Sequence, residues 1–531
     1  MELIGTSIIG SGRGSTRGET LHGLNPATGE KLAPTYYAAN AAEVDQAAQL
    51  AHQAFATYSR LSGREKTRFL RQIADNIAAL GDQLTTRATQ ETGLPAARIQ
   101  METGRTCNQL RLFADLIAEG SWVDARIDRA LPDRQPLPRP DIRSMLRPLG
   151  PVIVFCASNF PLAFSVAGGD TASAFAAGNP VIVKAHHAHP GTSEMVGLAV
   201  RDAVRACELP EGVFSLLYGS GSEVGTALIK HPLIKAGGFT GSRGGGRALM
   251  DAAAARPEPI PFYAEMSSIN PVFILPGAMR ERREQIAAGL HASVTLGAGQ
   301  FCTNPGLVMM ADDTDAGAFT AKLGELMTGT PEFTMLTPGI CASYRSGVLS
   351  HTRQAQVETI AQKNIESDKS GCRAGTALFK TDAPTYLANH ALSAEVFGPA
   401  TLLVTHSSRE QMLEIARTLE GHLTATIHGT ADDLREYSDL LAILETKVGR
   451  LVFNSFPTGV EVSHAIVHGG PYPSTSDGRS TSVGTRAIYR FTRQVCYQGF
   501  PDAVLPDELK NANPLGIWRL VDGQLTQGSL T

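Results

Sequence analysis

The sequence has little that would direct the protein to nucleic acid, to a charged membrane surface or to an oxidising compartment. Its 47 Lys and Arg residues nearly balance its 51 Asp and Glu residues, and no basic block stands out, so a nucleic-acid or acidic-membrane partner gains no support. The seven cysteines are scattered and form no CxxC pair, which argues against a disulfide framework or a zinc site. We therefore expect free thiols and a cytoplasmic protein.

Long uninterrupted apolar runs are also absent. Residues 1–16 contain only a short apolar stretch and no cationic start, so they do not form a secretory signal. Residues 148–183 carry one charge, Asp170, but prolines and asparagines interrupt them and would break a membrane-spanning helix of about 20 residues. We predict that this segment forms a buried strand, a turn, a buried helix and a second strand.

The length and the hydrophobic pattern predict more than one α/β domain. A chain of 531 residues is too long for one ordinary core. Helical periodicity dominates residues 40–120, and a Pro- and Arg-rich stretch at 128–148 is typical of an extended arm or linker. Beyond it, short apolar runs alternate with helical segments, and a second such pattern follows residue 273. This alternation predicts βαβ units with parallel sheets.

Three glycine-rich stretches resemble phosphate-binding turns to different degrees. Residues 8–15, "IIGSGRGS", are followed by turn-forming residues and no helix, so we reject them as a dinucleotide fingerprint. Residues 216–229, "LLYGSGSEVGTALI", lie between a strand and a helix, but their glycine spacing is one residue off the fingerprint, and ordinary turn glycines explain them equally well. A second strand-to-helix turn at residues 237–249 favours a nucleotide site, because helix N-termini attract phosphate.

Cys302 lies in "GAGQFCTNPG", where neither a helix nor a strand is favoured. A thiol on such a tightly turned backbone can be presented to a cleft as a nucleophile, whereas a core thiol would normally lie in an apolar-periodic run. A nucleophile needs a base and an oxyanion donor. Candidates for partner groups are Asn159 in "CASNFPLAF", Glu265 in "YAEMSSINP" and Glu395 in "SAEVFGP".

Together with "NPATGE" and "FTGS", these motifs resemble the NAD(P)-dependent aldehyde dehydrogenase superfamily, in order, from about Asn25 to about Gln494. The resemblance implies an α/β aldehyde dehydrogenase fold with a Rossmann-like cofactor domain, an α/β catalytic domain and a small β oligomerisation arm. It also implies a homodimer or homotetramer. We predict the cofactor domain at residues 1–120 and 144–264, the catalytic domain at 265–475, the arm at 121–143 and 476–500, and a C-terminal tail at 501–531.

The resemblance also implies roles for individual residues. Cys302 matches the nucleophile that attacks the aldehyde, Asn159 the oxyanion donor, and Glu265 the base that activates water for thioester hydrolysis. The matching cofactor-binding residues are Lys184, His187, Gly225, Gly241, Ser242, Glu395 and Phe397. Simple core packing explains Phe397 equally well. No metal is expected, because the histidines of "HHAH" have no nearby cysteine or carboxylate ligand.

The cofactor prediction depends on one departure from the family pattern. Many members have a glutamate where this chain has His187, and that glutamate binds the adenosine ribose and repels a 2′-phosphate. The histidine removes the negative charge. We therefore predict that the protein uses NADP, with NAD also possible.

The substrate is a small-molecule aldehyde whose identity the sequence narrows to two classes. "EMSSINP", "GQFCTNPG" and the C-terminal tail look most like 2,5-dioxopentanoate (α-ketoglutaric semialdehyde) dehydrogenases and NADP-linked fatty-aldehyde enzymes. The candidate substrate residues are Arg105, Gln109 and Phe160. Arg105 could pair with a substrate carboxylate, or it could be a solvated helical residue that pairs with Glu102.

Two other classes of protein are alternatives. A cysteine hydrolase would pair Cys302 with a histidine base, and no histidine here lies in a recognisable hydrolase motif. A non-catalytic protein of the same fold would be expected to lose Cys302 or Glu265, and both are present.

Overall fold

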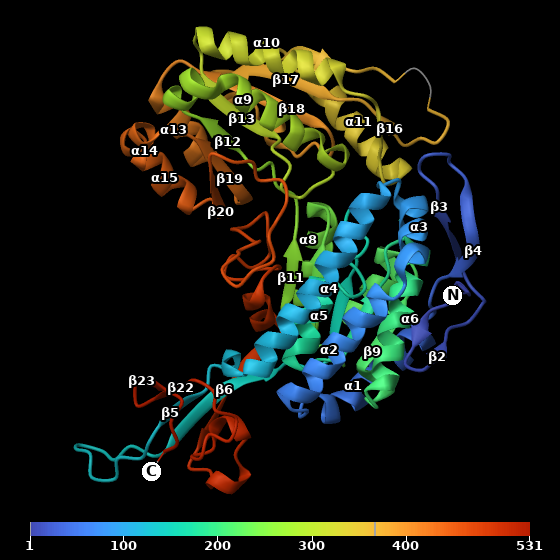
Figure 1. Cartoon of the computed structure of the whole chain (residues 1–531), viewed down its shortest axis with the longest axis vertical. Coiled ribbons are helices and arrows are strands. Elements are labelled where there is room, and N and C mark those ends of the chain that lie inside the picture. The colour runs from blue at the N-terminus through green and yellow to red at the C-terminus, as the bar shows by residue number, and fades with distance from the viewer. Residues whose placement is uncertain (1, 366–367, 531) are drawn as a thin grey trace.

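The computed structural model describes residues 2–365 and 368–530 and confirms a mixed α/β fold. Figure 1 shows three regions along the long axis: the sheet of the predicted catalytic domain with its helices, the sheet of the predicted cofactor domain with its helices, and a thin arm. We call the second of these the cofactor sheet. The two large sheets have seven strands each and the arm sheet has five, among the described residues. The chain therefore divides its core between two sheets, as its length predicts.

Four helices form the N-terminal region: α1 (Ala41–Tyr58), α2 (Gly63–Ala78), α3 (Gly81–Thr92) and α4 (Ala96–Glu119). They confirm the predicted helical character of residues 40–120. Capping boxes start α1 and α2, where Asn40 and Ser62 accept the backbone N–H groups of Glu43 and Glu65. A two-stranded sheet of β3 (Thr20–Leu24) and β4 (Lys31–Tyr37) precedes them.

The cofactor sheet is built around five parallel strands: β7 (Val152–Phe155), β8 (Val181–Lys184), β9 (Phe214–Leu217), β10 (Ala236–Thr240) and β11 (Phe262–Glu265). Their spatial order is β11-β10-β7-β8-β9, with β1 (Ile8–Ile9) and β2 (Gly12–Arg13) added antiparallel at the edge. The chain crosses from β9 to β10 on the other side of β7. Open α/β sheets bind ligands outside the carboxyl ends of the strands at such a reversal.

Alternate side chains of the cofactor sheet enter two different cores. Val152 and Val154 pack with α2, α5 (Gly169–Ala177) and α6 (Pro190–Ala206). Ile153 and Phe155 pack with α1, α7 (Thr226–Lys230) and α8 (Arg243–Ala254). Both faces of the sheet are therefore covered, which explains why these strands are continuously apolar.

The structure confirms two of the local predictions. Residues 148–183 form β7, a turn, α5 and β8 rather than one long helix. The rejected glycine stretch at residues 8–15 is the β1–β2 hairpin, with no helix after it. Within the described residues, every helix is too short or too polar to cross a bilayer.

The second large sheet has the order β15-β17-β18-β13-β12-β19-β20, and all neighbours are parallel except β15 and β17. Its strands are β12 (Val272–Ile274), β13 (Leu307–Ala311), β15 (Glu358–Gln362), β17 (Ala377–Asp382), β18 (Ala400–His406), β19 (His422–His428) and β20 (Val448–Phe453). Its helices are α9 (Pro276–Thr295), α10 (Thr314–Gly329), α11 (Pro338–Thr352), α12 (Ala383–Ala388), α13 (Arg409–Thr418), α14 (Ala431–Glu436) and α15 (Ser438–Glu445). A short pair, β14 (Phe333–Thr334) and β16 (Arg373–Ala374), lies beside them.

The arm sheet has the order β21-β6-β5-β22-β23. Its strands are β5 (Arg126–Asp128), β6 (Ile142–Pro148), β21 (Thr492–Gln498), β22 (Arg519–Val521) and β23 (Gln524–Thr526). Residues 142–148 thus form a regular strand, whereas the Pro- and Arg-rich stretch had predicted only an extended arm; every residue of β6 pairs with β21. The predicted domain boundaries stay predictions. The arm sheet crosses two of them, because β6 extends past residue 143 and β22 and β23 lie after residue 501.

Candidate active site

The carboxyl edge of the cofactor sheet gathers most of the residues predicted to form the site. Each lies at or beyond the carboxyl end of a parallel strand: Asn159 after β7, Lys184 at the end of β8, Gly225 after β9, Gly241 and Ser242 after β10, and Glu265 at the end of β11. Parallel strands bring their carboxyl ends to one edge, so residues far apart in the sequence meet there.

The backbone before Cys302 is tightly turned, as its sequence predicted. Gly297, Ala298 and Gly299 have φ values of +57°, +59° and +66°. A Cβ at Gly299 would lie 2.2 Å from the backbone carbon of Gly398, so only glycine allows the two chain segments to approach this closely. The turn sets the direction of the loop that follows it. Cys302 lies in that loop, before β13 begins.

Asn270 fixes the Cys302 loop from behind. Its Nδ2 donates to the carbonyl oxygens of Cys302 at 2.8 Å and Asn304 at 3.0 Å. Its Oδ1 accepts from the hydroxyls of Ser268 at 2.9 Å and Thr424 at 3.0 Å. The "SSIN" segment therefore anchors the loop to β19 by buried hydrogen bonds that do not involve the thiol.

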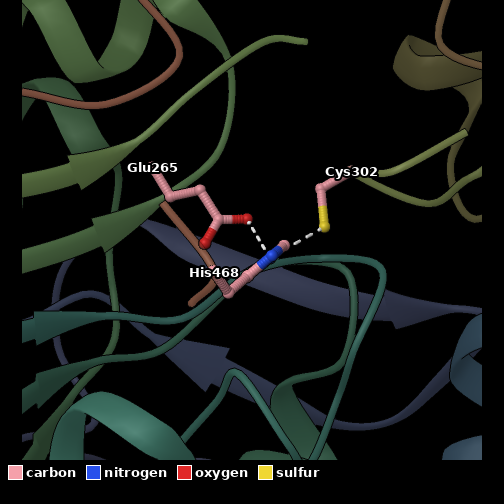
Figure 2. Close-up of side chains that lie close together, drawn as sticks. All are labelled: Glu265, Cys302 and His468. Carbon is pink, nitrogen blue, oxygen red and sulfur yellow. Dashed lines mark hydrogen bonds and ion pairs between the residues drawn. The ribbon is translucent and has the colours of Figure 1, made fainter. Parts of the chain in front are cut away.

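Three side chains meet at the centre of the site (Figure 2). Cys302 Sγ lies 3.3 Å from His468 Nε2, and the same nitrogen lies 2.9 Å from Glu265 Oε1. Ser482 Oγ donates to the other carboxylate oxygen of Glu265 at 2.6 Å. Glu265 is 3% exposed and His468 is 1% exposed, so the charges in this cluster are shielded from solvent.

The surroundings determine the charge of the Cys302 thiol and of the Glu265 carboxyl group. Burial raises the pKa of the Cys302 thiol well above its usual value, and the neighbouring Glu265 carboxylate raises it further. Burial also acts to raise the pKa of Glu265, but its contacts with His468, Ser482 and Cys302 outweigh burial and lower the pKa overall. The resting site therefore holds a protonated thiol and a carboxylate, with the His468 imidazole in contact with both.

The sequence analysis missed both His468 and Ser482. They come from the loop that follows β20, where Met266 N–H donates to the Ser474 carbonyl at 2.7 Å and Ser476 N–H donates to the Ala264 carbonyl at 2.9 Å. These bonds bring the C-terminal region alongside the end of β11. His468 is 166 residues from Cys302 in the chain, and only its place before a glycine pair in "HGGPYP" distinguished it.

Asn159 lies beside the Cys302 loop. Its Nδ2 donates to the Gln300 carbonyl at 3.0 Å, and the amide has a second hydrogen that this bond leaves available. The next residue, Phe160, packs its ring edge-on against Phe301 at 5.3 Å and against Phe164 at 5.2 Å. Asn159 and an aromatic wall of Phe160, Phe164 and Phe301 thus both contact the segment just before Cys302.

Arg105 projects from α4 toward the same aromatic wall. Its guanidinium carbon lies 5.6 Å from the Phe160 ring centre and 5.5 Å from that of Phe164. Its Nε and Nη2 atoms are buried and have no hydrogen-bond partner within the described residues. Glu102 instead pairs with Arg98 at 3.0 Å, so the alternative in which Glu102 pairs with Arg105 is wrong.

Gln109 is buried one turn further along α4, with its Nε2 packed against Gly169 at the start of α5. Its part in substrate binding stays a prediction.

Glu395 and Phe397 line a cavity that also includes Ser268 and Asn304, which belong to the framework around the Cys302 loop. Burial raises the pKa of Glu395 to about 7, although the Ser267 hydroxyl and the Ser268 backbone act in the opposite direction. A carboxyl that titrates near neutral pH can accept hydrogen bonds from ligand hydroxyls once it is deprotonated. The structure thus places Glu395 and Phe397 beside the framework of the Cys302 loop.

The carboxyl edge of the cofactor sheet, called the cofactor edge below, has glycine at positions that a dinucleotide would have to approach closely. A Cβ at Gly225 would lie 2.8 Å from the Phe155 ring, and one at Gly241 would lie 2.6 Å from the Phe239 ring. Ser242 caps α8 by accepting the Gly245 N–H at 3.2 Å. These two strand-to-helix turns fit the backbone cradle that a pyrophosphate needs.

The other side of the cofactor edge carries positive charge and no carboxylate at the predicted ribose position. Lys184 is 7% exposed, and burial lowers the pKa of its ammonium group. His187 is exposed, and its ring stacks on His186 with the ring centres 4.4 Å apart. The histidines of "HHAH" are outside the one group of three or more metal-ligand residues found in the described chain, which consists of Glu265, Cys302 and His468.

Comparison with known proteins agrees with this geometry. A model of the aldehyde dehydrogenase family matches residues 14–494. The α-ketoglutaric semialdehyde dehydrogenase 2 of Azospirillum brasilense is 51% identical over 526 residues, which cover 99% of this chain and 100% of that protein. The α-ketoglutaric semialdehyde dehydrogenase of Acinetobacter baylyi is 46% identical over 525 residues, which cover 98% of this chain and 99% of that protein.

Solved structures match the fold at lower identity. HpcC from Thermus thermophilus has a TM-score of 0.79 at 24% identity, and the match covers 94% of this chain and 93% of that one. The aldehyde dehydrogenase KauB from Pseudomonas aeruginosa has a TM-score of 0.80 at 20% identity, and the match covers 94% of this chain and 97% of that one. These structures agree on the fold. The family model and the two relatives above place this chain in the aldehyde dehydrogenase family.

Proposed function

We propose that the protein oxidises the semialdehyde of a 2-oxo acid, 2,5-dioxopentanoate, to 2-oxoglutarate, with NADP as the preferred cofactor. The observation that carries the substrate class is the unpaired guanidinium of Arg105. A buried charged N–H without a partner is costly, and a substrate carboxylate would relieve that cost by a bidentate pair. The names of the two full-length relatives, both α-ketoglutaric semialdehyde dehydrogenases, agree with this substrate.

The aromatic rings around Arg105 support the same orientation of the substrate. Phe160 packs against Phe301, the residue before the proposed nucleophile, and it also contacts the Arg105 guanidinium. A short substrate could therefore extend from Cys302 along this wall to Arg105. A long alkyl aldehyde would instead leave the guanidinium buried and unpaired.

We propose that Cys302 is the nucleophile and that His468 takes its proton. The thiol proton passes to Nε2, which lies 3.3 Å from Sγ, and the imidazolium is then stabilised by Glu265 at 2.9 Å. The thiolate attacks the aldehyde carbon to form a thiohemiacetal. The Cys302 backbone N–H and the free amide hydrogen of Asn159 hold the oxyanion, and one such donor typically lowers the barrier by about 3 kcal/mol.

Glu265 then acts on the second half of the reaction. After oxidation, the acyl group is bound to Cys302 as a thioester. Glu265 accepts a proton from water, and the resulting hydroxide attacks the thioester carbonyl and releases the acid and the Cys302 thiolate. The Ser482 hydroxyl orients the carboxylate for this role through its 2.6 Å hydrogen bond.

The cofactor would lie across the carboxyl edge of the cofactor sheet and, when bound, would supply the nicotinamide that accepts the hydride. The residues that would hold it are Lys184, His187, Gly225, Gly241, Ser242, Glu395 and Phe397. His187 presents no negative charge to a 2′-phosphate, and the Lys184 ammonium lies three residues before it in the chain. Both features favour NADP, while NAD remains usable.

We further propose a cytoplasmic homodimer or homotetramer that associates through the arm. β21 lies at the edge of the arm sheet, and a second copy could pair with it there. Tyr489 and Phe500, which flank that strand, are exposed.

The experiment that tests the substrate class compares two arginines on α4. Arg105→Met should raise KM for 2,5-dioxopentanoate about 10- to 100-fold, because it removes hydrogen bonds to a charged group worth about 1.5–3 kcal/mol. Activity on hexanal should hold or improve. Arg111→Met is the matched control, since Arg111 lies on the surface of the same helix and pairs with Asp75 at 2.9 Å.

If Arg105→Met changes activity on both aldehydes alike, Arg105 is a structural residue, and a fatty aldehyde becomes the better-supported substrate. Reduction of NADP only when an aldehyde is present would exclude a cysteine hydrolase, the other class for which a Cys–His pair is suited.

A further inference from the structure

We propose that Glu265, Cys302 and His468 form a binding site for a thiophilic divalent cation such as Zn²⁺, and that occupation of this site reversibly inactivates the enzyme. This goes beyond the dehydrogenase reaction, for which no resident metal is expected. It rests on the positions of three donor atoms and is independent of which aldehyde or cofactor the enzyme uses.

The three donor atoms already lie near the spacing that zinc requires. Zinc bonds of about 2.0–2.3 Å in a tetrahedral site place neighbouring ligand atoms about 3.3–3.6 Å apart. Here Sγ and Nε2 are 3.3 Å apart, Nε2 and Oε1 are 2.9 Å apart, and all three atoms lie within 4.8 Å of one another. Small side-chain movements would therefore complete three of the four ligand positions.

The donor chemistry also favours a cation at this point. In the tautomer with its proton on Nδ1, the neutral imidazole has one lone pair on Nε2, the nitrogen that lies near both Sγ and Oε1. Glu265 is only 3% exposed, and beyond its contact with His468 Nε2 its buried Oε1 has no hydrogen-bond partner among the described residues. A cation at the meeting point would satisfy this oxygen, the imidazole and the sulfur together.

The surroundings of the three donor atoms suit a cation that binds reversibly. Ser482 orients the Glu265 carboxylate through its other oxygen, as second-layer hydrogen bonds do in metal sites. Cys302 is only half-buried, so water could fill the fourth ligand position from the side where the aldehyde must approach. Thiolate and carboxylate together carry two negative charges, which match a divalent cation.

Binding would remove the nucleophile from the reaction. The Cys302 thiol loses one proton to solvent as the zinc–sulfur bond forms, and the lone pair that would attack the aldehyde is then held by the metal. His468 Nε2 is also occupied and cannot accept a proton. Zinc should therefore compete with the aldehyde, and a chelator should restore activity.

The test measures metal binding directly, without aldehyde or NADP. Chelator-treated protein near neutral pH is dialysed against Zn²⁺, and Co²⁺ is used as a coloured replacement whose thiolate charge-transfer band reports a sulfur ligand. We expect one tight equivalent, with the cobalt band present. Cys302→Ser should abolish the band, and His468→Phe and Glu265→Gln should each weaken binding by more than about tenfold.

Cys496→Ser is the matched control, because Cys496 is the exposed cysteine and lies on the arm. It should leave both the stoichiometry and the band unchanged. The proposal is overturned if wild-type protein lacks the tight equivalent, if the cobalt band survives in Cys302→Ser, or if His468→Phe binds zinc as tightly as wild type. Loss of dehydrogenase activity alone would test the proposed function and not this site.

Discussion

The cofactor edge and the catalytic centre lie side by side but are assembled in different ways. Each cofactor turn is local: residues 219–225 follow β9 directly, and residues 241–246 follow β10. The catalytic centre is not local, because Glu265, Cys302 and His468 come from three separate segments and the last two are 166 residues apart. One site is therefore made mainly of backbone and the other of converging side chains.

This difference predicts how each region tolerates substitution. At the cofactor edge, several turns and backbone groups share the ligand, so loss of one side chain should have a graded effect. At the proposed catalytic centre, each side chain would do one chemical step, and no neighbouring group would replace it. Substitutions there should cause much larger losses of activity.

The largest effect should come from Cys302→Ala. Turnover should fall by more than about a thousandfold, because the nucleophile is lost. The protein should stay folded, since Asn270 holds the loop through the Cys302 carbonyl and not through the thiol. Activity assays and thermal melting check both parts, with Cys496→Ala as the control. Dehydrogenase activity in a folded Cys302→Ala protein would rule out the proposed mechanism.

The next effect separates Glu265 from His468. Glu265→Gln should give a burst of NADPH and then turnover slowed by about 10²- to 10⁴-fold, because the thioester forms but is hydrolysed slowly. His468→Gln should slow the burst itself and make its rate rise with pH, because the high-pKa thiol must then ionise without the imidazole as its base. Rapid-mixing measurements of NADPH absorbance distinguish the two. If Glu265→Gln abolishes the burst, Glu265 itself deprotonates the thiol.

A smaller effect is expected at the cofactor edge. His187→Glu should shift the preference from NADP toward NAD by about tenfold, because the new carboxylate repels the 2′-phosphate. The ratio of kcat/KM values for the two cofactors measures the shift. His52→Glu is the control, since His52 is an exposed histidine on α1. An unchanged ratio in His187→Glu would mean that another residue determines cofactor choice.

The smallest effect concerns one buried histidine in each region. In the cofactor region, His189 Nε2 donates to the Ala157 carbonyl at 2.8 Å, and Nδ1 lies 3.2 Å from Ser193 Oγ. In the catalytic region, neither nitrogen of His428 has a hydrogen-bond partner within the described residues. At pH 8, His189→Phe should lower the free energy of unfolding by about 1–3 kcal/mol, whereas His428→Phe should be neutral or stabilising.

Acid should also destabilise the protein through His428. Burial lowers its pKa from 6.5 to about 4, with Arg282 adding to the effect. The unfolded chain therefore takes up a proton that the folded ring resists, so stability is lost as the pH falls from about 6.5 toward 4. His428→Phe should remove this part of the loss, as melting temperatures at pH 8 and pH 5 would show. Equal acid sensitivity in wild type and variant would contradict this account.

Much of the fold could be predicted from local pattern. The helices of residues 40–120, the strand–helix–strand unit at 148–183 and the two glycine-rich turns all follow from periodicity and turn residues. β6 was missed because prolines and arginines obscured its alternation, and only pairing with β21 makes it a strand. Arg105 was ambiguous for a related reason: the sequence placed Glu102 within reach, but that carboxylate pairs with Arg98.

The sequence by itself determined the strand ends at or after which Asn159, Lys184 and Gly241 lie. These residues meet because parallel strands bring their carboxyl ends to one edge. Only the tertiary structure decided that His468 meets Cys302. That contact depends on the C-terminal region folding back along β11, through bonds such as Met266 N–H to the Ser474 carbonyl at 2.7 Å. Local periodicity fixes the direction of a side chain within its own element, but packing between distant segments determines which side chains touch.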